Sequence, residues 1–240
     1  MRFVMIAIFT VIGWACAAVA QDAAAYPKMA PVEQYLMERD AEMQLARSAA
    51  PESISRDATI LVLGRQGYET AVQGKNGFTC FVGRAWGAAF DWDEFWNPKV
   101  KAADCLNPEA ARSMLPVISL RARMVMAGRS KAEIVSALNA AYEKKQLPQL
   151  ESGAMDYMMS KSSYLTDQGG HNMPHIMFYT QVKDGKDWGS GEAGSPVMSS
   201  PYWFFSPQEG SQAKGLPPIL VFLVAAPNWS DGTPVDIHHE

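Results

Sequence analysis

The order of its strand-like and helical segments limits what this chain can fold into. Three short segments rich in β-branched, aromatic and other apolar residues come early, at positions 58–64, 68–73 and 78–84, and glycine-containing turns separate them. Apolar runs divided in this way are typical of strands joined by tight connections. We therefore expect these segments to form a β-meander, preceded by a helix over residues 31–50 that ends at Pro51.

A pair of helices is expected after these strands. Asn107 followed by Pro108 is typical of a helix start, because asparagine caps the first turn and proline needs no hydrogen-bond partner there. Pro116 predicts a kink in this helix. Ser130 and Glu133 have the spacing of a capping box, which predicts the start of a second helix.

Three more strand-like segments follow, at 153–160, 175–182 and 218–225. We expect loops at 85–107, which is dense in aromatic residues, and at 183–216, which is rich in Gly, Ser and Pro. The order helix, three strands, helical pair, three strands predicts an α+β domain in which a single, mostly antiparallel sheet carries its helices on one face. That order is similar to the one in profilin-like and PAS-type domains.

The first twenty residues are typical of a secretory signal peptide. Arg2 gives a positive start, and residues 3–18 are uncharged and largely apolar. Ala18 and Ala20 are the small residues that signal peptidase needs before its cleavage site. We therefore expect residues 1–20 to be removed and the protein to be secreted or periplasmic.

The remaining residues, 21–240, are expected to form one domain, because a chain of this length can bury a single good core. We expect an ordered core over 30–232 and a polar tail over 233–240. No later apolar segment approaches the roughly 18 residues that cross a membrane. No transmembrane anchor is therefore expected after cleavage.

Two cysteines remain once the signal peptide, which contains Cys16, is removed. Export places Cys80 and Cys105 in an oxidising compartment, where an even pair favours a disulfide bond. The chain has no Cys-x-x-Cys motif and no further cysteine that would complete a thiolate cage. The alternatives to the disulfide are a reactive thiol or half of a metal site.

Composition and charge exclude several classes of protein. The chain is 48% hydrophobic and 19% charged, with a formal net charge of −4, which is typical of soluble globular proteins. It shows no basic runs of the kind that nucleic-acid binding uses, so we expect no nucleic-acid partner. It also lacks the GxSxG, SxxK, HExxH and Walker motifs. We expect a non-enzymatic ligand-binding or interaction module, with a hydrolase that has no recognisable motif as the weaker alternative.

Tryptophans concentrate in the expected loops. Trp86, Trp92 and Trp96 lie in the first long loop, and Trp203 lies in the second. Exposed aromatic rings stack on apolar ligand faces, so these four residues are a candidate binding surface for a small molecule, a glycan or another protein. The alternative is structural, because large aromatic side chains in loops also cover sheet edges and fill the core.

A second candidate site combines histidine and methionine. If residues 171–177 are extended, His171, Met173 and His175 lie on one face, because side chains alternate along a strand. Imidazole and thioether groups suit copper, and methionine selects Cu(I). The alternative function is thus a copper or other transition-metal binding protein. In the other interpretation the methionine fills the core, one histidine lies at the strand entrance, and Pro174 interrupts the alternation.

Several segments resemble a group of exported bacterial proteins that have no assigned activity. They are residues 53–82, the helix start at 107–116, the Gly-His-Asn-Met-Pro-His segment at 170–175, and residues 228–233. The resemblance covers most of the chain after the signal peptide. It implies an exported bacterial protein and transfers no residue role.

Overall fold

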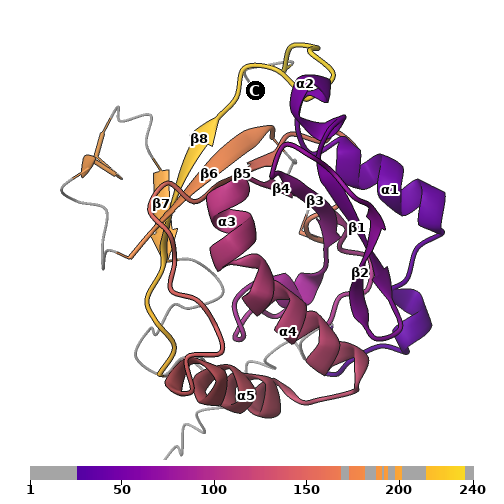
Figure 1. Ribbon diagram of the computed structural model, residues 1–240, viewed down its shortest axis with the longest axis vertical. Coiled ribbons are helices and arrows are strands. Elements are labelled where there is room, and N and C mark those ends of the chain that lie inside the picture. The colour runs from indigo at the N-terminus through magenta and orange to yellow at the C-terminus, as the bar shows by residue number, and fades with distance from the viewer. Residues whose placement is uncertain are drawn as a thin grey trace, which may run out of the picture.

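Eight strands join in one open sheet (Figure 1). The computed structural model describes residues 26–168, 173–181, 188–190, 192–193, 198–201 and 215–235. The strands are β1 (Thr59–Gly64), β2 (Gly67–Val72), β3 (Thr79–Gly83), β4 (Ala102–Leu106), β5 (Met155–Met158), β6 (His175–Thr180), β7 (Met198–Pro201) and β8 (Leu220–Ala225). In the order β2-β1-β3-β4-β5-β6-β8-β7, neighbours are antiparallel except for the parallel pair β1 and β3. The expected α+β class with a single, mostly antiparallel sheet is confirmed.

Some expected features fall on positions that the structure does not describe. These are the signal peptide at 1–20, His171, Trp203 and most of the tail at 233–240. In the described parts of the chain, no helix combines the length and the apolar character needed to cross a membrane.

The expected helices are present, but two of them are divided. The helices are η1 (Val32–Gln34), α1 (Arg39–Arg47), α2 (Glu52–Ser55), η2 (Ala85–Gly87), α3 (Pro108–Ser113), α4 (Leu115–Met126) and α5 (Lys131–Glu143). Residues 31–50 contain the 3-10 helix η1 and α1 instead of one helix. The helix that follows Asn107 breaks into α3 and α4 just before Pro116, because proline lacks the N–H that would continue the bonding pattern. Ser130 and Glu133 form the expected capping box of α5.

The first three strands do not form the expected meander. β1 lies between β2 and β3 and is parallel to β3, so β2 is at the edge of the sheet. The chain after β2 crosses the start of β1, where a Cβ atom on Gly74 would be 2.2 Å from the Thr59 nitrogen. A glycine is therefore required at this close approach. Beyond the crossing, the Thr59 N–H donates to the Phe78 carbonyl over 2.8 Å and leads into the parallel pairing.

Two strands lie in stretches that we expected to be loops. β4 lies within 85–107 and pairs with both β3 and β5 in the interior of the sheet, and β7 lies within 183–216 at the sheet edge. β4 has only five residues, and these include two alanines and an aspartate, residue types that are depleted in strands. Its local sequence therefore gives little indication of its central place.

Helices cover both faces of the sheet, not one face as expected. Along β1 and β3, alternate side chains belong to two separate apolar clusters. Ile60 and Cys80 pack with Ala46 of α1. Leu61 and Phe81 instead belong to the larger cluster, which includes residues of α4 and α5. Figure 1 shows α1 outside the curve of the sheet and α3 and α4 inside it. Because these strands are apolar on both faces, both faces need a covering layer.

A disulfide bond joins Cys80 of β3 to Cys105 of β4, as expected. The two cysteines are direct partners in the antiparallel register, with their Cα atoms 3.9 Å apart, and both are fully buried in the cluster beneath α1. The bond therefore fixes the register in which β4 pairs with β3.

A buried ion pair ties α1 to the sheet. The Arg84 guanidinium donates to Glu42 Oε1 over 2.9 Å, and the two side chains are 0% and 1% exposed. The guanidinium also donates to the backbone carbonyls of Tyr35 and Val82. The Leu63 N–H donates to the same Glu42 oxygen over 3.1 Å. The pair thus connects α1 to β1, to the end of β3 and to the segment after η1.

Removing Glu42 should strongly destabilise the protein. Glu42→Ala leaves a buried guanidinium without its counter-charge, and we expect the free energy of unfolding to fall by about 3 to 5 kcal/mol. The control is Glu69→Ala, which breaks the exposed ion pair with Arg39 and should have a much smaller effect. Urea denaturation followed by tryptophan fluorescence measures both variants. Equal, small losses would contradict the role given to the buried pair.

Removing the disulfide should also lower stability. The bond joins residues 25 positions apart, and the chain-entropy relation gives roughly 3 to 4 kcal/mol for a loop of that length. The variant with both Cys80→Ala and Cys105→Ala should lose about this much in urea denaturation without reductant. Addition of dithiothreitol should bring the wild-type protein to the stability of the variant and leave the variant unchanged. A double variant as stable as the wild type would refute the expectation.

Candidate functional site

A cavity of about 720 Å³ lies between the inner face of the sheet, α4 and the segment that follows β3. Its wall is mostly apolar. The aromatic and aliphatic side chains of the wall are Tyr68, Phe81, Trp86, Trp92, Val100, Ile118, Met158, Leu165 and Leu223. The polar side chains are Arg84, Asp91, Asp104, Arg121, Thr166, Gln168 and His175. The volume is within the range of small-molecule sites.

Two of the four candidate tryptophans line this cavity. Trp86 is in η2 and is almost completely buried, and Trp92, in the loop that follows, is half-buried. Trp96 instead packs in the core, edge-on against Phe95 with 4.6 Å between ring centres. Trp203 lies outside the described residues. The cavity therefore brings Trp86 and Trp92 together and leaves Trp96 out.

Buried hydrogen bonds hold the loop that carries these rings. The Tyr35 hydroxyl donates to the Trp96 carbonyl over 2.9 Å. Glu94 is buried and accepts from the Thr166 hydroxyl over 2.6 Å and from the Asn97 amide over 2.8 Å. These buried hydrogen bonds hold residues 94–97 of the loop in place, although the loop contains only a short 3-10 helix.

Two aspartates meet on the inner face of the sheet. Asp156 of β5 lies opposite Leu106 of β4, and Asp104 is two residues before Leu106, so both carboxyl groups are on the same face. Asp104 lines the cavity, whereas Asp156 lies behind it, fully buried, and accepts from the Tyr179 hydroxyl. Oδ1 of each carboxyl group is buried without a donor among the described residues. The two groups hydrogen-bond to each other, which requires a proton on one of them.

Burial raises the pKa of both carboxyl groups. It raises the pKa of Asp104 well above the ordinary value, and the neighbouring Asp156 carboxylate raises it further. Burial raises the pKa of Asp156 to about 6, while hydrogen bonds from Asp104 and Tyr179 oppose the rise. At neutral pH the pair therefore shares one proton, with Asp104 as the acid and Asp156 as the carboxylate that accepts from it.

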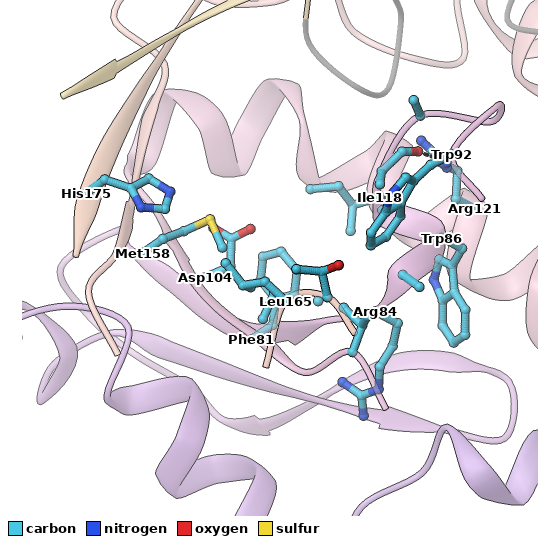
Figure 2. A pocket seen from close by; sticks show the side chains of 18 of the residues that line it. Phe81, Arg84, Trp86, Trp92, Asp104, Ile118, Arg121, Met158, Leu165 and His175 are labelled. Atoms are coloured by element: carbon cyan, nitrogen blue, oxygen red, sulfur yellow. Dashed lines mark hydrogen bonds between the residues drawn. The ribbon is translucent and has the colours of Figure 1, made fainter. Parts of the chain in front are cut away.

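His175 supplies a third buried polar group at this end of the cavity. Its Nδ1 lies 2.7 Å from the Met173 carbonyl oxygen. A carbonyl can only accept, so Nδ1 carries the proton of the neutral ring. Nε2 then has a lone pair, is buried, and finds no partner in the described part of the chain. Burial lowers the pKa of His175, which keeps the ring neutral at pH 7. Figure 2 shows this ring across Met158 from Asp104.

The predicted histidine and methionine cluster is only partly assembled in the described residues. His175 lines the cavity, Met173 is 45% exposed, and His171 is not described. The register partner of His175 is Met158 of β5. Over the residues that the structure describes, no three His, Cys, Asp or Glu side chains are grouped so that they suit a metal ion. Copper binding through His171, Met173 and His175 stays a prediction.

A cationic side chain lies at the other end of the cavity. Arg121 of α4 is buried, its guanidinium lies 4.2 Å from the centre of the Phe90 ring, and it donates to the Ala88 carbonyl over 2.8 Å. Figure 2 shows Arg121 on the far side of the cavity from Asp104 and His175. The two ends of the cavity therefore differ in charge and in hydrogen-bonding character.

Asp104 and Asp156 form an acid pair, and this pair is the part of the site that the sequence analysis did not predict. The loop expected over 85–107 hides the strand that carries Asp104, and no local pattern pairs that strand with the one that carries Asp156. A signal is present in retrospect, since Asp156 interrupts the otherwise apolar segment Ala-Met-Asp-Tyr-Met. A carboxylate inside an apolar strand is rarely buried without a partner or a function.

Among the described residues that line the cavity, two carry hydroxyl groups, Thr166 and Tyr68. The described lining residues include neither serine nor cysteine. The Thr166 hydroxyl donates to Glu94 over 2.6 Å, and the Tyr68 hydroxyl donates to the Val82 carbonyl over 2.7 Å.

Comparisons with known proteins assign no family to the chain. No protein-family model matches it, and neither a curated protein nor a solved structure does. The likeness to profilin-like and PAS-type domains rests on element order alone, and the resemblance to exported bacterial proteins stays a prediction. Function is therefore inferred from the cavity itself.

The pair formed by Asp104 and Asp156 should make stability fall as pH rises. Both carboxyl groups have pKa values above those of the unfolded chain, so above about pH 4 the folded protein binds more protons than the unfolded chain. Asp104→Asn cannot ionise and still has a donor for Asp156. The difference in free energy of unfolding between the variant and the wild type should therefore grow in favour of the variant from pH 4 to pH 8. We expect this increase to be at least about 1 kcal/mol.

Urea denaturation at pH 4, 6 and 8 measures this difference. The matched control is Asp231→Asn, because Asp231 is exposed and hydrogen bonds from Thr233 and Lys161 lower its pKa. Removing that carboxylate should not stabilise the protein at pH 8. A constant difference between Asp104→Asn and the wild type at all three pH values would contradict the shared proton.

Proposed function

We propose that this protein is an exported, non-enzymatic binding protein for a small, mainly apolar molecule. The observation that carries the proposal is the cavity of about 720 Å³, which combines a largely apolar wall with buried polar atoms that lack partners among the described residues. Small-molecule sites typically combine these features, because apolar contact supplies affinity and a few polar groups fix orientation.

The geometry favours a small molecule over a glycan or a protein partner. Tryptophans that recognise sugar chains or protein surfaces present their rings to solvent. Trp86 is only 2% exposed, and both Trp86 and Trp92 belong to the wall of the cavity. Trp92, which is half-buried, is therefore placed to contact a ligand that enters the cavity, while Trp86 packs behind it.

Two features support export as part of this proposal. The first twenty residues have the composition of a secretory signal peptide. The bond between Cys80 and Cys105 is of the kind that persists in oxidising compartments. We infer a secreted or periplasmic location from these features together.

N-phenyl-1-naphthylamine, a neutral dye that fluoresces in apolar surroundings, tests the binding function. We expect saturable binding of one molecule per chain, because the dye is smaller than the cavity. Ala89 lines the cavity in the loop between η2 and Trp92, so Ala89→Trp fills part of the space. This variant should bind the dye at least about tenfold more weakly in a fluorescence titration.

The matched control is Lys144→Trp, which adds the same indole at the exposed end of α5. Its affinity for the dye should equal that of the wild type. Dye binding that does not saturate, or that Ala89→Trp leaves unchanged, would refute the proposed function.

A further inference from the structure

The polar atoms at the end of the cavity next to β4 and β6 accept hydrogen bonds. Nε2 of His175 has a lone pair and is buried, in a residue that is 6% exposed. Asp104 lines the cavity and donates a hydrogen bond to Asp156, so its other lone pairs can only accept. The hydroxyls of Tyr179 and Tyr68 already donate to Asp156 and to a backbone carbonyl. A ligand group that binds at this end must therefore be a hydrogen-bond donor.

The same end carries negative charge without a counter-ion. In the described part of the chain, neither Asp104 nor Asp156 forms an ion pair with a lysine, arginine or histidine. Arg84, the cation that follows β3, is paired with Glu42. The proton that the two aspartates share takes the place of a cation. A cationic donor can replace that proton and satisfy the free acceptors.

We propose that the ligand is a primary ammonium compound with an apolar body of one or two rings. Its ammonium group donates to Asp104 and to Nε2 of His175. Its body packs against Phe81, Ile118 and Leu165 in the same cavity (Figure 2). This inference rests on the proposed function, because it assigns the chemical class of the ligand in that cavity.

Binding of the ammonium group exchanges one cation for another. As the group reaches Asp104, the proton shared with Asp156 leaves to solvent, so the total charge at this end does not change. Affinity should rise with pH while the free pair still holds its proton, and it should fall where the amine itself deprotonates. The other charged or titratable groups that face the pair or line the cavity are His175, Tyr68, Tyr179, Arg84 with its partner Glu42, Asp91, and Arg121 at the far end.

Three naphthalene derivatives test this inference as competitors of N-phenyl-1-naphthylamine. 1-Naphthylmethylamine carries the ammonium group, 1-naphthalenemethanol is its neutral counterpart, and 1-naphthoate carries a carboxylate. At pH 8 we expect the amine to displace the dye at a concentration about tenfold below that of the alcohol, because charge-assisted hydrogen bonds are the stronger ones. The carboxylate should be the weakest competitor. A change to pH 5 should weaken the amine and leave the alcohol unchanged.

Variants of Asp104 and His175 test whether these two residues cause the preference for the amine over the alcohol. Asp104→Asn should reduce the ratio between amine and alcohol to less than about threefold, because the charge partner of the ammonium group is removed. His175→Phe keeps an apolar ring and removes the Nε2 acceptor, and it should also lower the ratio. Asp231→Asn removes an exposed carboxylate and should leave the ratio unchanged. A circular dichroism spectrum equal to that of the wild type shows that each variant keeps its fold.

The outcomes separate this inference from the proposed function. Failure of the dye and of all three competitors to bind would refute the proposed function. Dye binding with the alcohol or the carboxylate as the better competitor would overturn the ammonium inference alone. An amine preference that Asp104→Asn leaves intact would overturn it as well.

Discussion

The buried ion pair between Glu42 and Arg84 joins the outer helix to the sheet and fixes the start of the cavity wall. Glu42 lies on α1 and also accepts from the backbone of β1, while Arg84 also donates to the carbonyls of Tyr35 and Val82. The next residues, Ala85–Gly87, are η2 and line the cavity. An isolated buried guanidinium is strongly unfavourable, so the pair permits few other arrangements of this segment. The position of Trp86 in η2 therefore depends on a contact with α1, a helix of the outer layer.

Side-chain alternation lets β4 serve structure and chemistry at the same time. Cys105 faces α1 and is bonded to Cys80, while the preceding residue, Asp104, faces the cavity. A shift of one residue in the pairing would exchange the two faces. Because the disulfide fixes this register, it also determines that the carboxyl group of Asp104 reaches Asp156. The covalent bond on the outer face thus positions the polar groups of the inner face.

Local chemistry in the sequence predicts the elements of this fold better than it predicts their arrangement. Helix caps and turns involve residues that are close in sequence, and they predict the capping box of α5 and most strands. The disulfide follows from the presence of only two cysteines after the signal peptide. The place of β1 between β2 and β3 depends on a chain crossing at Gly74, which looks like any turn glycine in the sequence. The acid pair depends on β4 lying beside β5, a contact between distant segments. The sequence analysis included Trp86, Trp92 and His175 among the candidates because aromatic and imidazole side chains are common in binding sites. Asp104 could not be singled out, because only its folded environment distinguishes it from other aspartates.

The acid pair lowers the stability of the fold at a position where a bound ligand can raise it again. The fully buried Asp156 and the half-buried Asp104 share one proton and make the folded state less stable as pH rises, and an asparagine at position 104 would avoid this without a change of size. The core around them needs no such groups, since the neighbouring positions of the sheet are filled by apolar side chains. Unfavourable polar groups of this kind concentrate at functional sites, where binding offsets them. In the proposed complex the ammonium group pairs with Asp104 in place of the shared proton, so ligand binding and folding stability are linked through this carboxyl group.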